Sequence, residues 1–369
     1  MEKLWKYKKI GEVCIVERGA SPRPIDKYIT DNESGINWIK IGDTSDSMYI
    51  TETAQKIIVE GMKKSRYVKP GDFLLSNSMS FGRPYILKID GCIHDGWLVL
   101  RDENALFDKR FLYYYLSSKT TYKKLKSMAV GGVVNNLNSE MVRNVIVPVP
   151  DKEEQSEIAD LFDKIKKTLD DRKQELEQLD TLVKSRFVEM FGDIITGKYN
   201  YKIRKLGDVA FIGSSHRVFT TEFVESGIPF YRGTEIGELA NGIEPSEPYY
   251  ISEEHYNKLT KDNTKPRIGD LLMPSICNKG QIWMVDTDRP FYYKDGRVLC
   301  ISPNRDIFNS KYLEYFMRIK TLVEYPKLGS GSTFAEFKIF LLKDMDVLVP
   351  PRNVQNQFAD FVASVDKSK

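Results

Sequence analysis

The sequence predicts an α+β fold in which two similar globular domains are joined by one long helix. Two observations predict the paired domains: the same short motifs occur twice in the same order, and each copy mixes short strand-like runs with a helical stretch. A third observation predicts the long helix, because residues 151–191 contain neither glycine nor proline.

The internal repeat is the strongest of these signals. Eight motifs return in the same order about 200 residues later, which is improbable by chance. The matched segments are Lys9–Val13 with Lys205–Val209, Gly35–Lys40 with Gly227–Arg232, Pro70–Leu74 with Ile268–Leu272, Gly82–Arg83 with Gly280–Gln281, Asp95–Gly96 with Asp295–Gly296, Phe111–Leu112 with Tyr312–Leu313, Val145–Pro148 with Val347–Pro350, and Gln155–Asp160 with Gln355–Asp360.

Both copies predict the same order of elements: strands, a helix, a loop rich in small polar residues, and a last strand that ends at proline. The first copy predicts strands at 36–41, 56–59, 72–76, 84–89, 97–100 and 144–149, with a helix at 108–126. The second predicts strands at 228–232, 270–273, 282–285 and 297–301, with a helix at 309–324. We therefore expect globular domains at 1–150 and 193–351.

The segment 151–192 predicts a long spacer helix. Its apolar residues are spaced by alternating fours and threes, which is typical of a coiled-coil seam, although one amphipathic helix lying on a core remains the alternative. The seam residues are Ile158, Phe162, Ile165, Leu169, Leu176, Leu179, Val183, Phe187 and Met190.

A second helix is expected to begin at 352–369, where Phe358 and Val362 repeat the pattern of Ile158 and Phe162. This helix is truncated relative to the first. We therefore expect much of the seam from Leu169 to Met190 to lack an intramolecular partner, so that the chain self-associates or binds another subunit there.

Composition excludes several classes of protein. The 369 residues carry a formal net charge of +3 and are 41% hydrophobic, which argues against disorder. No apolar run approaches the roughly 20 residues of a membrane span. The four cysteines lie far apart without a CxxC pair, so we expect neither a metal site nor disulfides, and a cytoplasmic protein without a membrane anchor.

The charge is distributed unevenly along the chain. Residues 1–150 carry 23 basic and 17 acidic side chains, residues 151–192 carry 8 and 12, and residues 193–351 carry 21 of each. A basic domain followed by an acidic helix is the pattern expected of a DNA-facing domain on a protein-facing spacer.

Enzymatic motifs are scarce. The sequence has no phosphate-binding GxxxxGK[ST] loop, no GxGxxG after a strand, no HExxH and no GxSxG. With only three histidines there is little material for acid–base catalysis, so we expect no catalytic residue.

Polar loops at equivalent places in the two copies favour DNA binding, because arginine and asparagine side chains suit guanine and adenine edges. A solvated turn is the alternative for each loop. The candidate residues are Arg18, Ser21, Arg23, Ser76, Asn77, Ser78, Ser80, Arg83, Asn135 and Asn136 in the first copy, and Ser214, Ser215, Arg217, Arg232, Ser275, Asn278, Lys279, Gln281, Ser332 and Thr333 in the second.

The duplicated Gly-Asp strand entries, the Val-x-Val-Pro strands and the Gln-x-x-Ile-Ala helix start resemble DNA specificity subunits of type I restriction–modification systems, over essentially the whole chain. The resemblance implies two target recognition domains that each read half of a bipartite site in double-stranded DNA, with the helices setting their spacing. It also implies docking of methyltransferase subunits, which bring S-adenosylmethionine, and recruitment of a restriction subunit, whereas this chain binds no cofactor.

Two other functions stay open from the residues alone. One is a DNA methyltransferase or nuclease with an unrecognised site. The other is a two-domain interaction protein that does not bind DNA.

Overall fold

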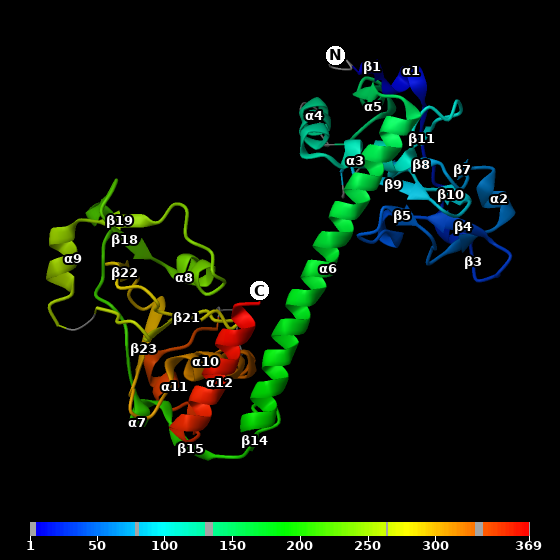
Figure 1. Ribbon diagram of the computed structural model, residues 1–369. Helices are drawn as coiled ribbons and strands as arrows, with labels where there is room; N and C mark the ends of the chain where they lie inside the picture. Colours follow the sequence, from blue (N-terminus) through cyan, green and yellow to red (C-terminus); the bar gives the residue numbers. More distant parts are fainter. Residues whose placement is uncertain (1–4, 78–80, 130–135, 263–264, 329–334, 369) are drawn as a thin grey trace. The chain divides into compact units, whose positions relative to one another are not determined.

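A computed structural model describes residues 5–77, 81–129, 136–262, 265–328 and 335–368 (Figure 1). The chain divides into unit 1 (Met1–Arg172) and unit 2 (Lys173–Lys369). The boundary falls inside the long helix α6 (Lys152–Phe191), so each unit keeps one part of that helix.

Within the described residues, unit 1 forms two five-stranded sheets. The first has the order β2 (Ile15–Arg18), β11 (Trp97–Arg101), β8 (Phe73–Ser76), β9 (Pro84–Leu87), β5 (Tyr49–Ile50). The second has the order β3 (Ile29–Thr30), β6 (Lys56–Ile57), β4 (Ile36–Ile39), β10 (Gly91–Ile93), β7 (Arg66–Val68). Leu98 and Leu100 of β11 join a core with the helices, whereas Trp97 and Val99, which alternate with them, join a core between the sheets.

Unit 2 repeats this plan in two four-stranded sheets, counted over the part of the chain that the structure describes. The first has the order β16 (Ala210–Gly213), β23 (Val298–Pro303), β20 (Leu271–Pro274), β21 (Trp283–Met284), and the second β17 (Phe223–Val224), β19 (Tyr249–Ile251), β18 (Ile228–Tyr231), β22 (Tyr292–Tyr293). Strand β23 alternates in the same way, with Leu299 and Ile301 in the helix-side core and Val298 and Cys300 in the core between the sheets.

Each unit is closed by pairing an early strand with its last strand. β1 (Lys6–Lys9) runs antiparallel to β12 (Ile146–Val149), with Lys6 opposite Val149. β15 (Lys202–Lys205) pairs with β24 (Asp346–Val349) in the same register, with Lys202 opposite Val349. The predicted last strands therefore find partners that the sequence pattern did not assign.

The repeated Gly-Asp motif makes the turn into the central strand of each unit. Gly71 and Gly269 have φ angles of +90° and +85°, which favour glycine. The aspartate that follows each glycine accepts a hydrogen bond from the backbone N–H three residues before it, at 2.9 Å and 2.8 Å. The motif is thus explained by backbone geometry.

The glutamine of the Gln-x-x-Ile-Ala motif ties α6 to the body of unit 1. Gln155 is fully buried. Its amide nitrogen donates to the carbonyl oxygens of Leu106 (3.2 Å) and Pro150 (3.0 Å), and its oxygen accepts from the backbone N–H of Asp108 (2.8 Å). One side chain therefore joins the ends of three segments.

Gln355, on the C-terminal helix α12 (Arg352–Asp366), makes the same three contacts in unit 2. It donates to the carbonyl oxygens of Ile307 (2.9 Å) and Pro350 (2.8 Å) and accepts from the backbone N–H of Asn309 (2.9 Å). The repeat therefore extends to individual hydrogen bonds.

The C-terminal end of the predicted seam is covered. Val183 and Phe187 are fully buried, and Leu179 and Met190 pack partly against the same core. The ring of Phe358 on α12 lies 5.3 Å from that of Phe187, and α12 lies beside the end of α6 (Figure 1). The expectation that this end of the seam lacks a partner is therefore wrong, because a short second helix is enough to cover it.

The rest of the seam is largely exposed. Ile158 packs partly on the unit 1 core, and Phe162 stacks on Tyr114 at 5.0 Å. The seam residues that stay exposed beyond them are Ile165 (46%), Leu169 (60%) and Leu176 (42%).

The predicted helix 108–126 is two helices, α3 (Lys109–Ser117) and α4 (Lys119–Ala129), because Ser118 has an extended backbone. The predicted helix 309–324 is α10 (Ser310–Glu324). Two helices of unit 2 were not predicted, α8 (Gly233–Leu239) and α9 (Glu253–Leu259). The shorter elements are α1 (Ile10–Val13), α2 (Val59–Met62), α5 (Ser139–Arg143), α7 (Leu206–Val209), α11 (Ile339–Lys343), β13 (Gly192–Asp193) and β14 (Lys198–Tyr199).

Candidate nucleic-acid interface

Four polar side chains of the candidate loops in unit 1 converge on Asp95. Ser21 Oγ donates to Asp95 Oδ1 at 2.9 Å, and Arg23 Nη2 donates to Oδ2 at 3.2 Å. Arg18 Nε and Asn77 Nδ2 donate to the Asp95 carbonyl oxygen at 3.0 Å and 2.8 Å. Asp95 therefore joins two loops that the sequence analysis treated separately.

The corner around Asp95 is tightly packed and charged. A Cβ on Gly19 would lie 2.1 Å from the carbonyl oxygen of His94, so only glycine fits there. Burial raises the pKa of Asp95, but hydrogen bonds from Ser21 and from a backbone N–H, together with the nearby Arg23, outweigh burial and hold the pKa below its usual value. The carboxylate is thus ionised, and it orients an Arg23 side chain that is 81% exposed.

Three candidate residues lie in the interior. Ser76, Asn77 and Ser275 are at most 1% exposed. Besides the Asp95 contact, the Asn77 carbonyl oxygen accepts from the backbone N–H of Leu137. Ser76 and Asn77 position their loops through hydrogen bonds, and none of the three side chains lies at the surface where the sequence analysis expected a DNA contact.

Arg83 remains a surface candidate. Its guanidinium donates to Asp46 Oδ1 at 3.0 Å and lies 5.5 Å from the centre of the Tyr85 ring. Because the Asp46 side chain is fully exposed, this ion pair is weak. The guanidinium is therefore available to a phosphate or a base.

The equivalent corner of unit 2 is held by serine hydroxyl groups. Ser214 Oγ accepts from the backbone N–H of Gly296 at 2.9 Å, and Ser215 Oγ donates to the carbonyl oxygen of Tyr293 at 2.5 Å. Ser214 takes the place of Arg18 in the repeat, so the two units use the same corner with different side chains.

The other unit 2 candidates differ in how they are held. Gln281 Oε1 accepts from a backbone N–H at 3.1 Å, and the Arg232 guanidinium is paired with Glu235, which is 4% exposed. These contacts fix both side chains in place. The exposed candidates are Arg217, Asn278 and Lys279.

Five candidates lie outside the described residues, and Asn136 is half-buried at the edge of one such segment. The five are Ser78, Ser80, Asn135, Ser332 and Thr333.

Sequence reasoning missed the role of Asp95 and His94. The signal was present, since Asp95–Gly96 is one of the repeated motifs, but a repeated Asp-Gly pair is also typical of an ordinary turn. Only the fold shows that loops from distant parts of unit 1 meet there.

His94 is held as a neutral imidazole. The backbone N–H of Ile41 donates to His94 Nε2 at 3.1 Å, and an Nε2 that carried a proton could not accept this hydrogen bond. Burial lowers the pKa of His94 below its ordinary value, although the nearby Asp95 acts in the opposite direction.

We expect unit 1 to lose stability as the pH falls below about 6.5, the pKa of an unfolded histidine. The unfolded chain takes up the proton first, so the contribution of neutral His94 is complete above that pH and declines toward its lower folded pKa. Melting temperature measured from pH 7.5 to pH 5 should fall more steeply for the wild type than for His94→Gln. Parallel curves would contradict the assignment.

Among the described residues, no group of three or more His, Cys, Asp and Glu side chains is arranged to hold a metal ion. The cysteines Cys14, Cys92, Cys277 and Cys300 are buried thiols. The described helices include none that is long and apolar enough to cross a membrane.

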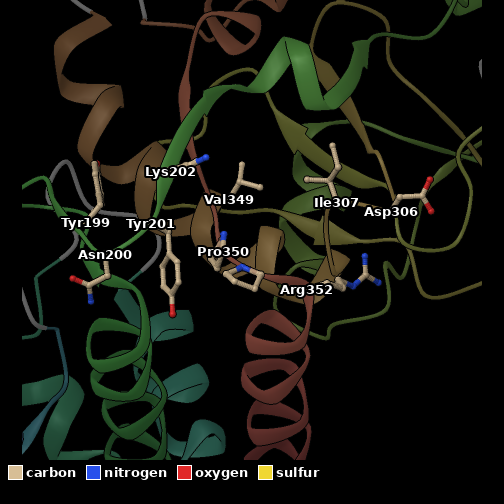
Figure 2. A pocket seen from close by; sticks show the side chains of 10 residues that line it. Tyr199, Asn200, Tyr201, Lys202, Asp306, Ile307, Val349, Pro350 and Arg352 are labelled. Carbon is tan, nitrogen blue, oxygen red and sulfur yellow. The ribbon is translucent and has the colours of Figure 1, made fainter.

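A cavity of about 740 Å³ lies where α12 leaves β24 (Figure 2). One side is formed by residues 199–202 and the other by the loop at 306–307 and the start of α12. Its ten lining residues include one carboxylate, that of Asp306, and neither histidine nor cysteine. This junction therefore offers no set of catalytic groups.

The pattern of the type I restriction modification DNA specificity domain matches residues 2–181. Specificity subunits of the type I restriction enzymes MjaIX and MjaVIII from Methanocaldococcus jannaschii are 23% and 22% identical to this chain, over 98% of this chain and 86% of each subunit. Residues 2–181 therefore match a type I restriction–modification DNA specificity domain, and the chain is similar to type I specificity subunits along nearly its whole length. These matches confirm the prediction of a DNA specificity subunit and give no support to a methyltransferase or nuclease.

Two solved structures show the same fold. A chain from a structure on complex assembly and conformational transition of the type I R-M system is similar with a TM-score of 0.59 and 18% identity, over 99% of this chain and 90% of that chain. The S subunit from M. genitalium gives a TM-score of 0.55 and 13% identity, over 100% and 90%. The predicted α+β fold of two domains joined by a long helix is thereby confirmed.

Proposed function

We propose that units 1 and 2 of this specificity subunit each read one half of a bipartite site in double-stranded DNA. The carrying observation is the shared corner: in both units a polar loop after the first strand of the central sheet is anchored to the segment before its longest strand. The surface side chains of the polar loops differ, with Arg18, Arg23 and Arg83 in unit 1 and Arg217, Asn278 and Lys279 in unit 2. Equivalent loops that carry different donors and acceptors are what two different half-sites require.

We further propose the partners that the family resemblance implies. Methyltransferase subunits would dock on the helices and supply S-adenosylmethionine, a restriction subunit would join them, and the complex would act in the cytoplasm. The first turns of α6 support a rigid docking element, because Arg110 holds Asp160 and Asp163 at 2.7 Å each.

The exposed part of the seam supports a second protein contact. Ile165 and Leu169 lie on one face of α6, in a segment with polar residues on its other faces. We propose that a methyltransferase subunit covers this face in the complex, and that in its absence a second copy of this chain does.

Methylation mapping tests the bipartite reading. In cells that carry the complete system, Arg23→Ala should relax one half-site and Arg217→Ala the other, each with a loss of about 1–3 kcal/mol of discrimination. The wild type supplies both half-sites and their spacer. If either substitution weakened both halves equally, these arginines would be phosphate contacts, and a pattern without two half-sites would overturn the proposal.

A further inference from the structure

Unit 2 contains a cavity of about 840 Å³ at the ends of β16, β20 and β23. Its buried lining includes Asp270, Tyr293 and Cys300, which are 3%, 2% and 5% exposed. The volume falls within the range of about 300–1,000 Å³ that is typical of small-molecule sites.

The strand register identifies the equivalent place in unit 1. Glu17 lies opposite Val99, and Gly213 lies opposite Cys300 at the matching position of the repeat. In the same register, Arg101 of unit 1 corresponds to Ser302 of unit 2. Two long charged side chains are thus replaced by two small residues.

Those charged side chains fill the space in unit 1. Arg101 Nη1 lies 2.5 Å from Glu17 and Arg101 Nε lies 3.3 Å from Asp72, while Arg66 Nη1 lies 2.8 Å from Glu17. Asp72 corresponds to Asp270, so this aspartate is common to both units. The other members of the unit 1 ion-pair network have no counterpart in unit 2. The cavity is therefore a feature of unit 2 that the shared fold does not require.

The rim of the unit 2 cavity carries a cluster of cations. Lys265, Arg267 and Arg305 line it, against the carboxylates Asp262 and Asp270. Arg305 lies 3.2 Å from Asp270, and Asp262 lies 2.5 Å from His216. The lining thus keeps an excess of positive charge, which favours an anionic ligand.

An aromatic ring and neutral polar groups complete the lining. Phe211 is 70% exposed, and its ring folds back over Gly213, where a Cβ would lie 2.8 Å from it. Burial raises the pKa of Cys300 to about 12 and that of Tyr293 further still, so both stay neutral. With the Ser302 hydroxyl they form a polar floor beneath the ring.

We propose that this cavity binds a nucleotide. Lys265 and Arg305 hold the phosphate, the Phe211 ring stacks on the base, and the hydroxyl groups of the floor bind the base edge. The nucleotide is either a free mononucleotide or one extruded from bound DNA. The second source rests on the proposed function, and the first does not.

Isothermal titration of the full chain with AMP, adenosine and inorganic phosphate tests the site. We expect one AMP per chain, bound at least tenfold more tightly than adenosine or phosphate. Phe211→Ala should weaken AMP binding at least about fivefold and leave phosphate binding unchanged, because the base loses the ring on which it stacks. Lys265→Ala should weaken both, whereas Lys258→Ala, an exposed lysine on α9 outside the cavity, should weaken neither.

Filling the cavity is the decisive substitution. Gly213→Glu with Ser302→Arg introduces the unit 1 pair and should weaken AMP binding at least tenfold, while circular dichroism checks that the variant folds. Unchanged AMP affinity in the folded filled variant would overturn the site, as would equal affinity of wild type and Lys265→Ala.

A duplex arm separates the two sources. Fluorescence anisotropy measures the affinity for a duplex that carries the site found by methylation mapping. The reconstituted complex contains either the wild-type chain or the filled variant Gly213→Glu with Ser302→Arg. If the wild-type chain does not bind AMP and the filled variant loses affinity for the duplex, the cavity binds a nucleotide of the DNA. If the wild-type chain binds AMP and the filled variant keeps its affinity for the duplex, the cavity binds a free nucleotide. If filling the cavity changes neither the affinity for AMP nor the affinity for the duplex, the proposed site is wrong. A complex that binds AMP but no duplex overturns the proposed function alone.

Discussion

Gln155→Leu should lower the free energy of unfolding of unit 1 by about 3 kcal/mol. Leucine fills a similar volume but leaves the backbone N–H of Asp108 and the carbonyl oxygens of Leu106 and Pro150 without their buried partner. Each buried group left unsatisfied costs about 1–3 kcal/mol. For a unit of this size the melting temperature should fall by about 6–12 °C, measured by scanning calorimetry.

The repeat supplies an internal control for this experiment. Gln355→Leu should lower the transition of unit 2 and leave that of unit 1 in place. Gln174→Leu changes an exposed glutamine of α6 and should shift neither transition by more than about 0.5 kcal/mol. If Gln155→Leu melted like Gln174→Leu, the three hydrogen bonds would not be what holds α6 to unit 1.

Purified without other subunits, the chain should associate with itself at micromolar concentration through the exposed face of α6. Ile165 and Leu169 are each about half exposed there, so burying the exposed half contributes roughly 0.8–1.5 kcal/mol for each residue on each copy. Ile165→Glu with Leu169→Glu should therefore weaken association at least about 100-fold, which corresponds to about 2.7 kcal/mol. Sedimentation velocity over a concentration series measures it.

A matched variant places the same added charge on the opposite side of the helix. Gln174→Glu with Gln178→Glu changes two exposed residues there and should leave association unchanged. A wild-type chain that sediments as a monomer at tens of micromolar would contradict the prediction. Equal weakening by both pairs would show a general effect of charge.

The elements that the sequence predicted well are those with a strong periodic signal. The Gly-free and Pro-free run became α6, and the central strands β8 and β11 lie within one or two residues of their predicted ranges. Local spacing determines such elements because one face of each must be buried.

What the sequence could not predict depends on contacts between distant segments. The second sheet of unit 1 contains strands of two residues, such as Ile29–Thr30, too short to show an alternating pattern. Asn77 carries the side chain expected of a base contact, yet the fold buries it against Asp95. The loss of Glu17 and Arg101 from unit 2 shows as a cavity only once the strand register is known.

The pairing of β1 with β12 has a consequence for how such proteins change over time. Because Lys6 lies opposite Val149, the chain enters and leaves the globular body of unit 1 at adjacent strands, and it does the same in unit 2 at Lys202 and Val349. A folded body whose ends meet can be exchanged for another of the same plan without disturbing what flanks it. A gene rearrangement that exchanges the segment between β1 and β12, or between β15 and β24, would replace the polar loops of one unit in a single step.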